Sequence, residues 1–401
     1  MPRTLINSLL RGVQAGSNFT APAGYHRGMA VLSRRFSRRL LLASALLPAR
    51  LLASDGKSQK GQSFEPEIDR YPDEATELQV YRMTDPSFSS TLPSPDNRII
   101  SRNSATLLFA SNRSGLPQAF RMNLKTGEME QVTDRKDVDG ASLNLLPDGR
   151  SFAYFAAKTL YLVNLGNLRE RAVYTVPEGW ELRPGLHVSN DGASAIFIES
   201  RAENCRVRNI SLAQGTARTV LETPFVITDV IERLQRPQIL YRQPDKALWL
   251  AHANGQENAA LKLARGVIGP AHWSPDGKTL LYLNYPEEPG QLNAIREYTP
   301  ESQTDRLVAK TSQYVAFSPN RDTSVFVGSS RNAASPAILI MLRVTRRELT
   351  LCEHRASRAE TVAPLFAPDS QRIYFQSDRH GMPAIYALHV ERLVERIEDA
   401  E

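Results

Sequence analysis

The sequence predicts an all-β protein folded as a seven-bladed β-propeller with four antiparallel strands per blade. One observation is a recurring phrase in which a Pro-Asp-Gly turn leads into a buried run of β-branched and aromatic residues, most clearly in Ser274–Leu283. The other is spacing, because successive copies lie 43, 44 and 49 residues apart, with one interval of 85. A period of about 40–45 residues with several short strands per unit is typical of a propeller.

The seven units follow one another along the chain. The interval of 85 residues is twice the usual spacing, so it holds one unit without the turn signature, which we place at Arg236–Tyr241. A further unit at Arg102–Phe109 opens the series. The weaker copies of the turn phrase stand at Leu146–Arg150, Ser189–Gly192, Ser318–Arg321 and Ala367–Ser370.

The two ends of the repeat region are expected to meet in one blade. The last unit shows only three strands and ends near Val390. Glu77–Asp85 has the pattern of an outer strand and is similar to Met129–Asp134, the outer strand expected in the first blade. An N-terminal strand closing the last blade would remove an exposed sheet edge.

Segments outside the propeller, which we place at residues 76–390, differ from it in composition. Residues 1–54 contain eight Arg and no acidic residue, and Ser37–Leu42 resembles a twin-arginine export signal, with Met29 as a possible true start. The polar residues 55–75 are expected to be a linker, and the charged residues 391–401 a frayed tail. We therefore expect a periplasmic or secreted protein.

Charge excludes some classes of partner. The net charge of +6 resides in the leader, since 41 basic and 43 acidic residues remain after it. We therefore expect no nucleic-acid partner. The apolar run Leu40–Leu47 is followed by Pro48 and Arg50 and is too short for a stable membrane span. The two cysteines, Cys205 and Cys352, are expected to be small buried residues, although an exported protein permits a disulfide.

Several phrases resemble known propeller families. The loops Ser111–Gly115 and Ser377–Gly381, together with Thr126–Asp134, resemble TolB-type propellers. Arg171–Trp180, with its Val-Pro-Glu-Gly-Trp phrase, resembles the oligogalacturonate lyases, which are seven-bladed polysaccharide lyases. The resemblance covers about residues 76–390.

The lyase resemblance implies β-elimination on short galacturonate oligomers from pectin, with a manganese-type cation neutralising the uronate carboxylate. It also implies histidine and glutamine ligands in the propeller mouth. The matching positions here hold Arg358, Thr361 and Ala363, and a further histidine position falls near Pro270. The phrase expected to hold the arginine base reads Ala247–Trp249. We therefore expect the family metal site to be absent.

A different set of residues is expected to face the channel. Side chains four, six and eight positions before each turn residue share one face of the inner strand, because the pleat has a period of two. The resemblance places that face on the channel. It carries His187 and His272 at equivalent positions, with Arg183 and Tyr314 further along. Arginine and tyrosine suit a uronate ring. Packing, sugar binding and metal binding are all open for the two histidines.

Two functions follow from these patterns. The first is a lyase-like propeller that binds or cleaves uronate oligosaccharides, with the candidate residues Arg183, His187, His272 and Tyr314. The second is a non-catalytic, TolB-like exported propeller that binds an envelope protein. No Gly-x-Ser-x-Gly elbow, phosphate-binding loop, Cys-x-x-Cys or His-Glu-x-x-His motif supports any other chemistry.

Overall fold

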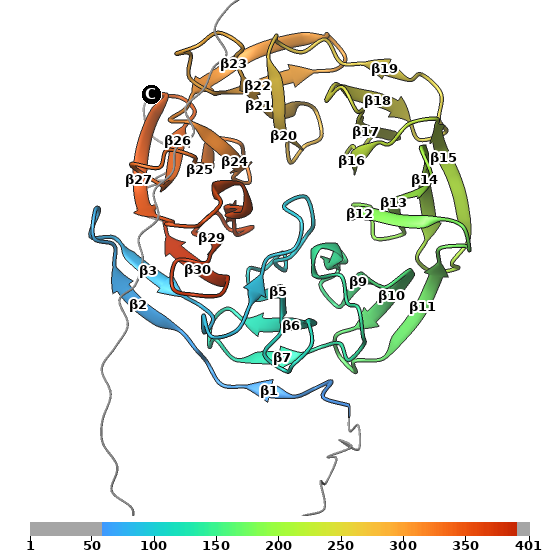
Figure 1. Cartoon of the computed structure of the whole chain (residues 1–401), viewed down its shortest axis with the longest axis horizontal. Helices are drawn as coiled ribbons and strands as arrows, with labels where there is room; N and C mark the ends of the chain where they lie inside the picture. The colour runs from blue at the N-terminus through green and yellow to red at the C-terminus, as the bar shows by residue number, and fades with distance from the viewer. Residues whose placement is uncertain (1–57, 391–401) are drawn as a thin grey trace, which may run out of the picture. The chain divides into compact units, whose positions relative to one another are not determined.

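The structure is a computed structural model that describes residues 58–390, so the expected leader and the expected C-terminal tail lie outside the described residues. Seven antiparallel sheets stand in a ring (Figure 1). Two short 3-10 helices, η1 (Gly140–Ser142) and η2 (Ala359–Thr361), are the helical segments of this range. The prediction of an all-β, seven-bladed propeller is therefore confirmed.

The blades take their strands in chain order, from the channel outward. Blade 1 consists of β4 (Ser90–Thr91), β5 (Thr106–Ser111), β6 (Gln118–Asn123) and β7 (Met129–Gln131). Blade 2 consists of β8 (Asn144–Leu145), β9 (Ser151–Ala156), β10 (Thr159–Asn164) and β11 (Glu170–Thr175). Blade 3 consists of β12 (Glu181–Val188), β13 (Ser194–Arg201), β14 (Asn204–Ser211) and β15 (Ala217–Thr223).

The second half of the ring repeats this order. Blade 4 consists of β16 (Thr228–Glu232), β17 (Gln238–Arg242), β18 (Leu248–His252) and β19 (Ala259–Ala260). Blade 5 consists of β20 (Val267–Trp273), β21 (Leu280–Tyr285), β22 (Ala294–Thr299) and β23 (Thr304–Lys310). Blade 6 consists of β24 (Tyr314–Pro319), β25 (Val325–Ser330), β26 (Ala337–Leu342) and β27 (Arg347–Glu353). Blade 7 begins with β28 (Leu365–Phe366), β29 (Arg372–Ser377) and β30 (Ala384–His389).

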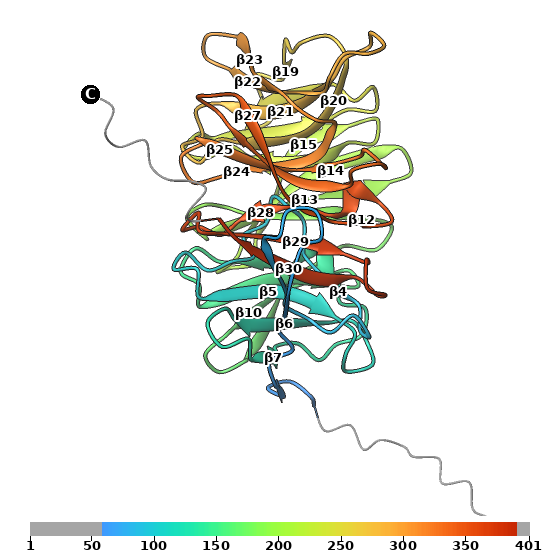
Figure 2. The same ribbon diagram turned by 90° about the vertical axis from the view of Figure 1, so that its left-hand side faces the viewer.

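The fourth strand of blade 7 comes from the other end of the chain. β3 (Gln79–Arg82) pairs antiparallel with β30, with Val80 opposite Leu388. Figure 2 shows this side of the ring, where blade 7 lies between blade 6 and blade 1. The expectation that an N-terminal strand closes the last blade is confirmed. Closure pairs the edge of β30, which would otherwise offer unpaired backbone groups.

The segment expected to be a linker carries two further strands. β1 (Ser63–Phe64) adds a fifth strand to blade 1 beside β7, and β2 (Asp69–Pro72) adds a fifth strand to blade 7 beside β3. Neither strand has the alternating apolar pattern that would reveal it, because each lies on an outer edge with one face in solvent. The chain thus runs along the outer edges of both blades that meet at the closure.

The core lies between neighbouring blades. Phe155 of blade 2 and Phe197 of blade 3 meet edge to face, with ring centroids 5.0 Å apart. Cys205 and Cys352 are buried free thiols, as expected. Within residues 58–390, no helix has the length and apolar character needed to cross a membrane.

The turn glycine packs against the turn of the preceding blade. A Cβ on Gly192 would lie 2.8 Å from Pro147 Cδ, and a Cβ on Gly277 would lie 2.3 Å from the Leu234 carbonyl oxygen. Both glycines also have positive φ, +74° and +68°. Glycine is therefore required at these turns by the backbone conformation and by the close approach of the neighbouring blade.

Candidate functional site

The inner strand of blade 1 is interrupted by residues 92–98, which we call the channel insert. Before the insert, Ser90 of β4 pairs with Ser111, and after it Ile100 pairs with Leu107. The insert therefore leaves the line of the strand, and Figure 1 shows a loop entering the middle of the ring beside β5.

Hydrogen bonds fix the channel insert to opposite sides of the ring. Asn97 Nδ2 donates to two carbonyl oxygens of blade 2, both at 3.1 Å, and Arg98 Nη1 donates to the carbonyl of Leu145 at 3.0 Å. In blade 5, Nδ1 of His272 lies 2.7 Å from Asp96 Oδ1. The insert is thus a fixed wall within the channel.

A cavity of about 340 Å³ lies against this wall. It opens on the side of the Asp-Gly turns, because its lining includes turn residues such as Asn190 and Pro368. His187 and His272 both line it, as expected from their equivalent positions. The polar residues of the lining are Asp96, Asn97, Arg98, Asn144, His187, Asn190, Glu232, His272 and Ser318.

Unpartnered polar atoms are concentrated in this cavity. Twelve buried side-chain nitrogen or oxygen atoms of the described residues lack a hydrogen-bond partner, and four belong to the cavity lining: His187 Nδ1, His272 Nε2, Trp273 Nε1 and Ser318 Oγ. Buried polar groups are nearly always hydrogen-bonded, so each exception needs a cause. Four such atoms in one cavity are available to water or to a polar ligand that enters it.

The two histidines differ in charge. Burial lowers the pKa of His187 to about 4, so this imidazole is neutral near pH 7. Burial would also lower the pKa of His272, but the adjacent Asp96 carboxylate outweighs burial and raises it. With Arg98, the cavity therefore combines a guanidinium, the His272 imidazole, whose pKa is raised by Asp96, and the neutral His187 imidazole. Such a set can bind a carboxylate and several hydroxyl groups.

These shifts predict opposite effects of pH on stability. The folded pKa of His187 lies below its unfolded value, so its contribution is present above about pH 6.5 and is lost as the pH falls toward 4. The folded pKa of His272 lies above its unfolded value, so its contribution is present below about pH 6.5 and is lost as the pH rises through the folded pKa. The free energy of unfolding therefore falls as the pH drops from about 6.5 toward 4. We expect His187→Gln to make this fall smaller by on the order of 2 kcal/mol.

Urea denaturation at a series of pH values measures this prediction. His272→Gln serves as the opposite variant, because it should remove the loss on the alkaline side and leave the acid side unchanged. Parallel stability curves for the wild type and both variants between pH 4 and pH 8 would contradict the assignment of the two protonation states.

Tyr314 does not face the channel, contrary to expectation. Its side chain is fully buried in the core with Phe317 and Phe326, and its ring occupies the space where Gly328 lacks a Cβ. The register of β24 shifts between Tyr314 and Ala316. One extra residue in a strand turns the side chains beyond it to the other face, so counting in steps of two fails there.

Arg183 also lies outside the cavity. The register of β12 shifts between Leu182 and Leu186, so the backbone around Arg183 departs from a regular strand. Arg183 Nε instead donates to Ser200 Oγ at 2.9 Å on the neighbouring strand. Of the four expected residues, the structure brings together the two histidines, which lie on the turn side of these irregularities.

Sequence reasoning missed Asp96 and Arg98. A signal for them exists, because blade 1 carries two turn-like phrases in succession, Ser94–Asn97 and Ser101–Ser104. The second phrase makes the blade turn, with Ser101 N donating to the carbonyl of Thr106 at 2.9 Å. The first phrase is surplus and forms the channel insert.

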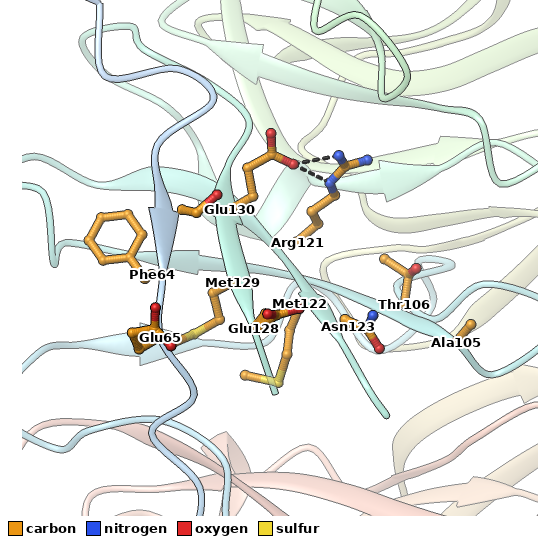
Figure 3. Close-up of a pocket in the computed structure, with 11 residues that line it drawn as sticks. Phe64, Glu65, Ala105, Thr106, Arg121, Met122, Asn123, Glu128, Met129 and Glu130 are labelled. Carbon is orange, nitrogen blue, oxygen red and sulfur yellow. Dashed lines mark hydrogen bonds and ion pairs between the residues drawn. The ribbon is translucent and has the colours of Figure 1, made fainter. Parts of the chain in front are cut away.

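A larger cavity, of about 440 Å³, lies on the outer edge of blade 1 beneath β1 (Figure 3). Its most prominent polar contact is the ion pair of Arg121 and Glu130, at 2.5 Å. Among its described lining residues, none has a buried polar atom without a partner. Size alone therefore does not make it the better candidate.

A divalent cation does not fit the described residues. No group of three His, Cys, Asp or Glu side chains within residues 58–390 is arranged to hold a metal ion. At the positions expected from the lyase resemblance, Thr361 Oγ1 donates to the carbonyl of Arg358 at 2.8 Å, and Ala363 offers no donor atom.

The fold and the site define a class: a seven-bladed propeller with a polar cavity in its channel. The chain matches no protein-family model. It is 22% identical over 382 residues to an oligogalacturonide lyase of Pectobacterium atrosepticum, covering 82% of this chain and 98% of that protein. It is 23% identical over 383 residues to an oligogalacturonate lyase of Dickeya dadantii, with the same coverage.

A solved structure shows the same likeness. An oligogalacturonate lyase in complex with manganese superimposes with a TM-score of 0.79 at 23% sequence identity, covering 84% of this chain and all of that one. The resemblance to oligogalacturonate lyases seen in the sequence phrases is therefore confirmed along the whole propeller.

Proposed function

We propose that this protein is a lyase-like propeller that binds short uronate oligosaccharides of the kind released from pectin, without the divalent cation of its relative. The observation that carries the proposal is the set of four unpartnered polar atoms on one channel cavity. The likeness to oligogalacturonide lyases over almost their whole length supplies the class of sugar.

The cavity has groups for each part of a uronate. Arg98 can pair with a carboxylate through two parallel N–H donors. His272, with its pKa raised by Asp96, offers its Nε2 to the ligand. The neutral His187 and the indole of Trp273 are available to the ring hydroxyls. A cavity of about 340 Å³ lies within the usual range for small ligands.

Calorimetric titration with di- and trigalacturonate tests this proposal. We expect Arg98→Gln to weaken binding by at least about tenfold, because it removes a charged pair with the carboxylate. Arg150→Gln, which changes an exposed arginine in the turn of blade 2, is the matched control and should bind as the wild type does.

Manganese and a chelator complete the test. Neither should change the affinity, and neither should change the ultraviolet absorbance of unsaturated di- or trigalacturonate incubated with the protein. Turnover that a chelator abolishes would show that a metal site exists. Absence of binding to either sugar by the wild type would reject the sugar and favour the protein-binding alternative.

A further inference from the structure

We propose that the channel cavity continues into a groove between blades 3 and 4, and that Arg236 in this groove binds the carboxylate of the next uronate of an oligosaccharide. The inference rests on the proposed function for the chemistry of the ligand. It adds a second subsite and a residue that selects for chain length.

The groove is continuous with the cavity. It has a volume of about 260 Å³ and is lined by residues 189–191 and 232–236. Asn190, Glu232 and Leu234 line both spaces. At the junction, Asn190 Oδ1 lies 3.4 Å from Nη2 of Arg98, the guanidinium assigned to the first carboxylate. A ligand seated at Arg98 therefore extends directly past Asn190.

The groove exists because blade 4 has lost the turn signature. The hydrogen bond that closes its turn, from Arg233 N to the carbonyl of Gln238 at 2.8 Å, has a counterpart in blades 3 and 5. Counted from that bond, Arg236 stands where those blades have Gly192 and Gly277, but the positive φ of this turn falls one residue earlier, on Gln235 at +58°.

A glycine at this position allows the turn to pack on the preceding blade, as Gly192 packs on Pro147. The turn of blade 4 has a different backbone conformation, with its positive φ at Gln235, and space remains between the turns of blades 3 and 4. Pro237 favours an extended backbone at Arg236 and fixes the direction in which its side chain leaves the turn. Positions where a protein departs from its own repeated sequence pattern are commonly functional sites.

The charges of the groove leave Arg236 available. It is exposed and forms no ion pair within residues 58–390, and together with Arg233 it helps to lower the pKa of the nearby Glu301 carboxyl. The neighbouring Arg233 is paired with Glu301 at 2.9 Å. Asp191 Oδ1 accepts bonds within its own turn, from Ser189 Oγ at 2.6 Å and from a backbone N–H. Among the residues that line the groove, Arg236 is therefore the exposed cation that can meet a carboxylate, beside the acidic side chains of Asp191 and Glu232.

Binding of galacturonate, digalacturonate and trigalacturonate to the full-length protein distinguishes this subsite from the cavity. Arg236→Gln should leave the affinity for galacturonate within about twofold and weaken the affinity for both oligomers by about tenfold. Arg236→Gly, which restores the residue of the neighbouring blades, should have the same effect. Arg321→Gln in the turn of blade 6 is the matched control on the same face and should change none of the affinities.

The outcomes separate the two proposals. Oligomer affinities that survive both Arg236 variants would overturn the groove, as would an equal loss for the monomer and the oligomers. In both cases binding by the wild type would leave the proposed function standing. Absence of binding of all three sugars to the wild type would overturn both.

Discussion

A protein that begins at residue 84 is expected to lose on the order of 5 kcal/mol of stability relative to one that begins at residue 58. The truncation removes β1, β2 and β3. It exposes the edge of β30 and deletes two core side chains, Val80 and Met83, which are 0% and 4% exposed. Urea denaturation followed by circular dichroism measures the difference.

A protein that begins at residue 74 separates the contributions. It lacks β1 and β2 but keeps the pairing of β3 with β30. It also loses Glu67, the ion-pair partner of Arg113, whose side chain is only 1% exposed, so we expect it to lose about 3 kcal/mol. Equal stability of the proteins that begin at residues 58 and 84 would show that blade 7 does not need its N-terminal strand.

Replacing Glu199 by leucine is the point substitution with the largest expected effect on stability. Glu199 is completely buried, lies 2.6 Å from Arg206 and accepts a hydrogen bond from Tyr174 Oη at 2.7 Å. Leucine leaves the guanidinium of Arg206, with a side chain only 15% exposed, without its carboxylate. Breaking a buried pair by removing one partner costs about 3–5 kcal/mol.

Glu130→Leu provides the matched control on another blade. Glu130 also pairs with an arginine on the adjacent strand, Arg121, at 2.5 Å, but the two side chains are 23% and 35% exposed. Solvent screens this pair, so we expect a loss of at most about 1 kcal/mol. Similar unfolding midpoints for the two leucine variants would mean that burial does not decide the value of the pair at Glu199.

The fold was predictable because the turn phrase repeats a local rule in most blades. A Pro-Asp-Gly turn needs only neighbouring residues to form, and its spacing counts the blades. The two histidines were predictable for a related reason, since they lie close to that turn, where the strand is still regular. The cavity that they share follows from the ring itself.

Tyr314 and Arg183 were not predictable by the same method. Both lie beyond irregular stretches of the inner strands, at the register shifts of β24 and β12. A bulge depends on how a strand fits its neighbours in the ring, and no residue type near Tyr314 announces it. Asp96 reaches the site through an insertion, and its contact with His272 joins positions 176 residues apart.

The pairing of β3 with β30 also sets an order of events during synthesis. The first of these strands leaves the ribosome about 300 residues before its partner, so blade 7 is unfinished until nearly the whole chain has been made. A nascent chain that stops before Ala384 has no partner for β3 and leaves sheet edges open to other chains. The ring can therefore close only after translation has reached the end of the last blade.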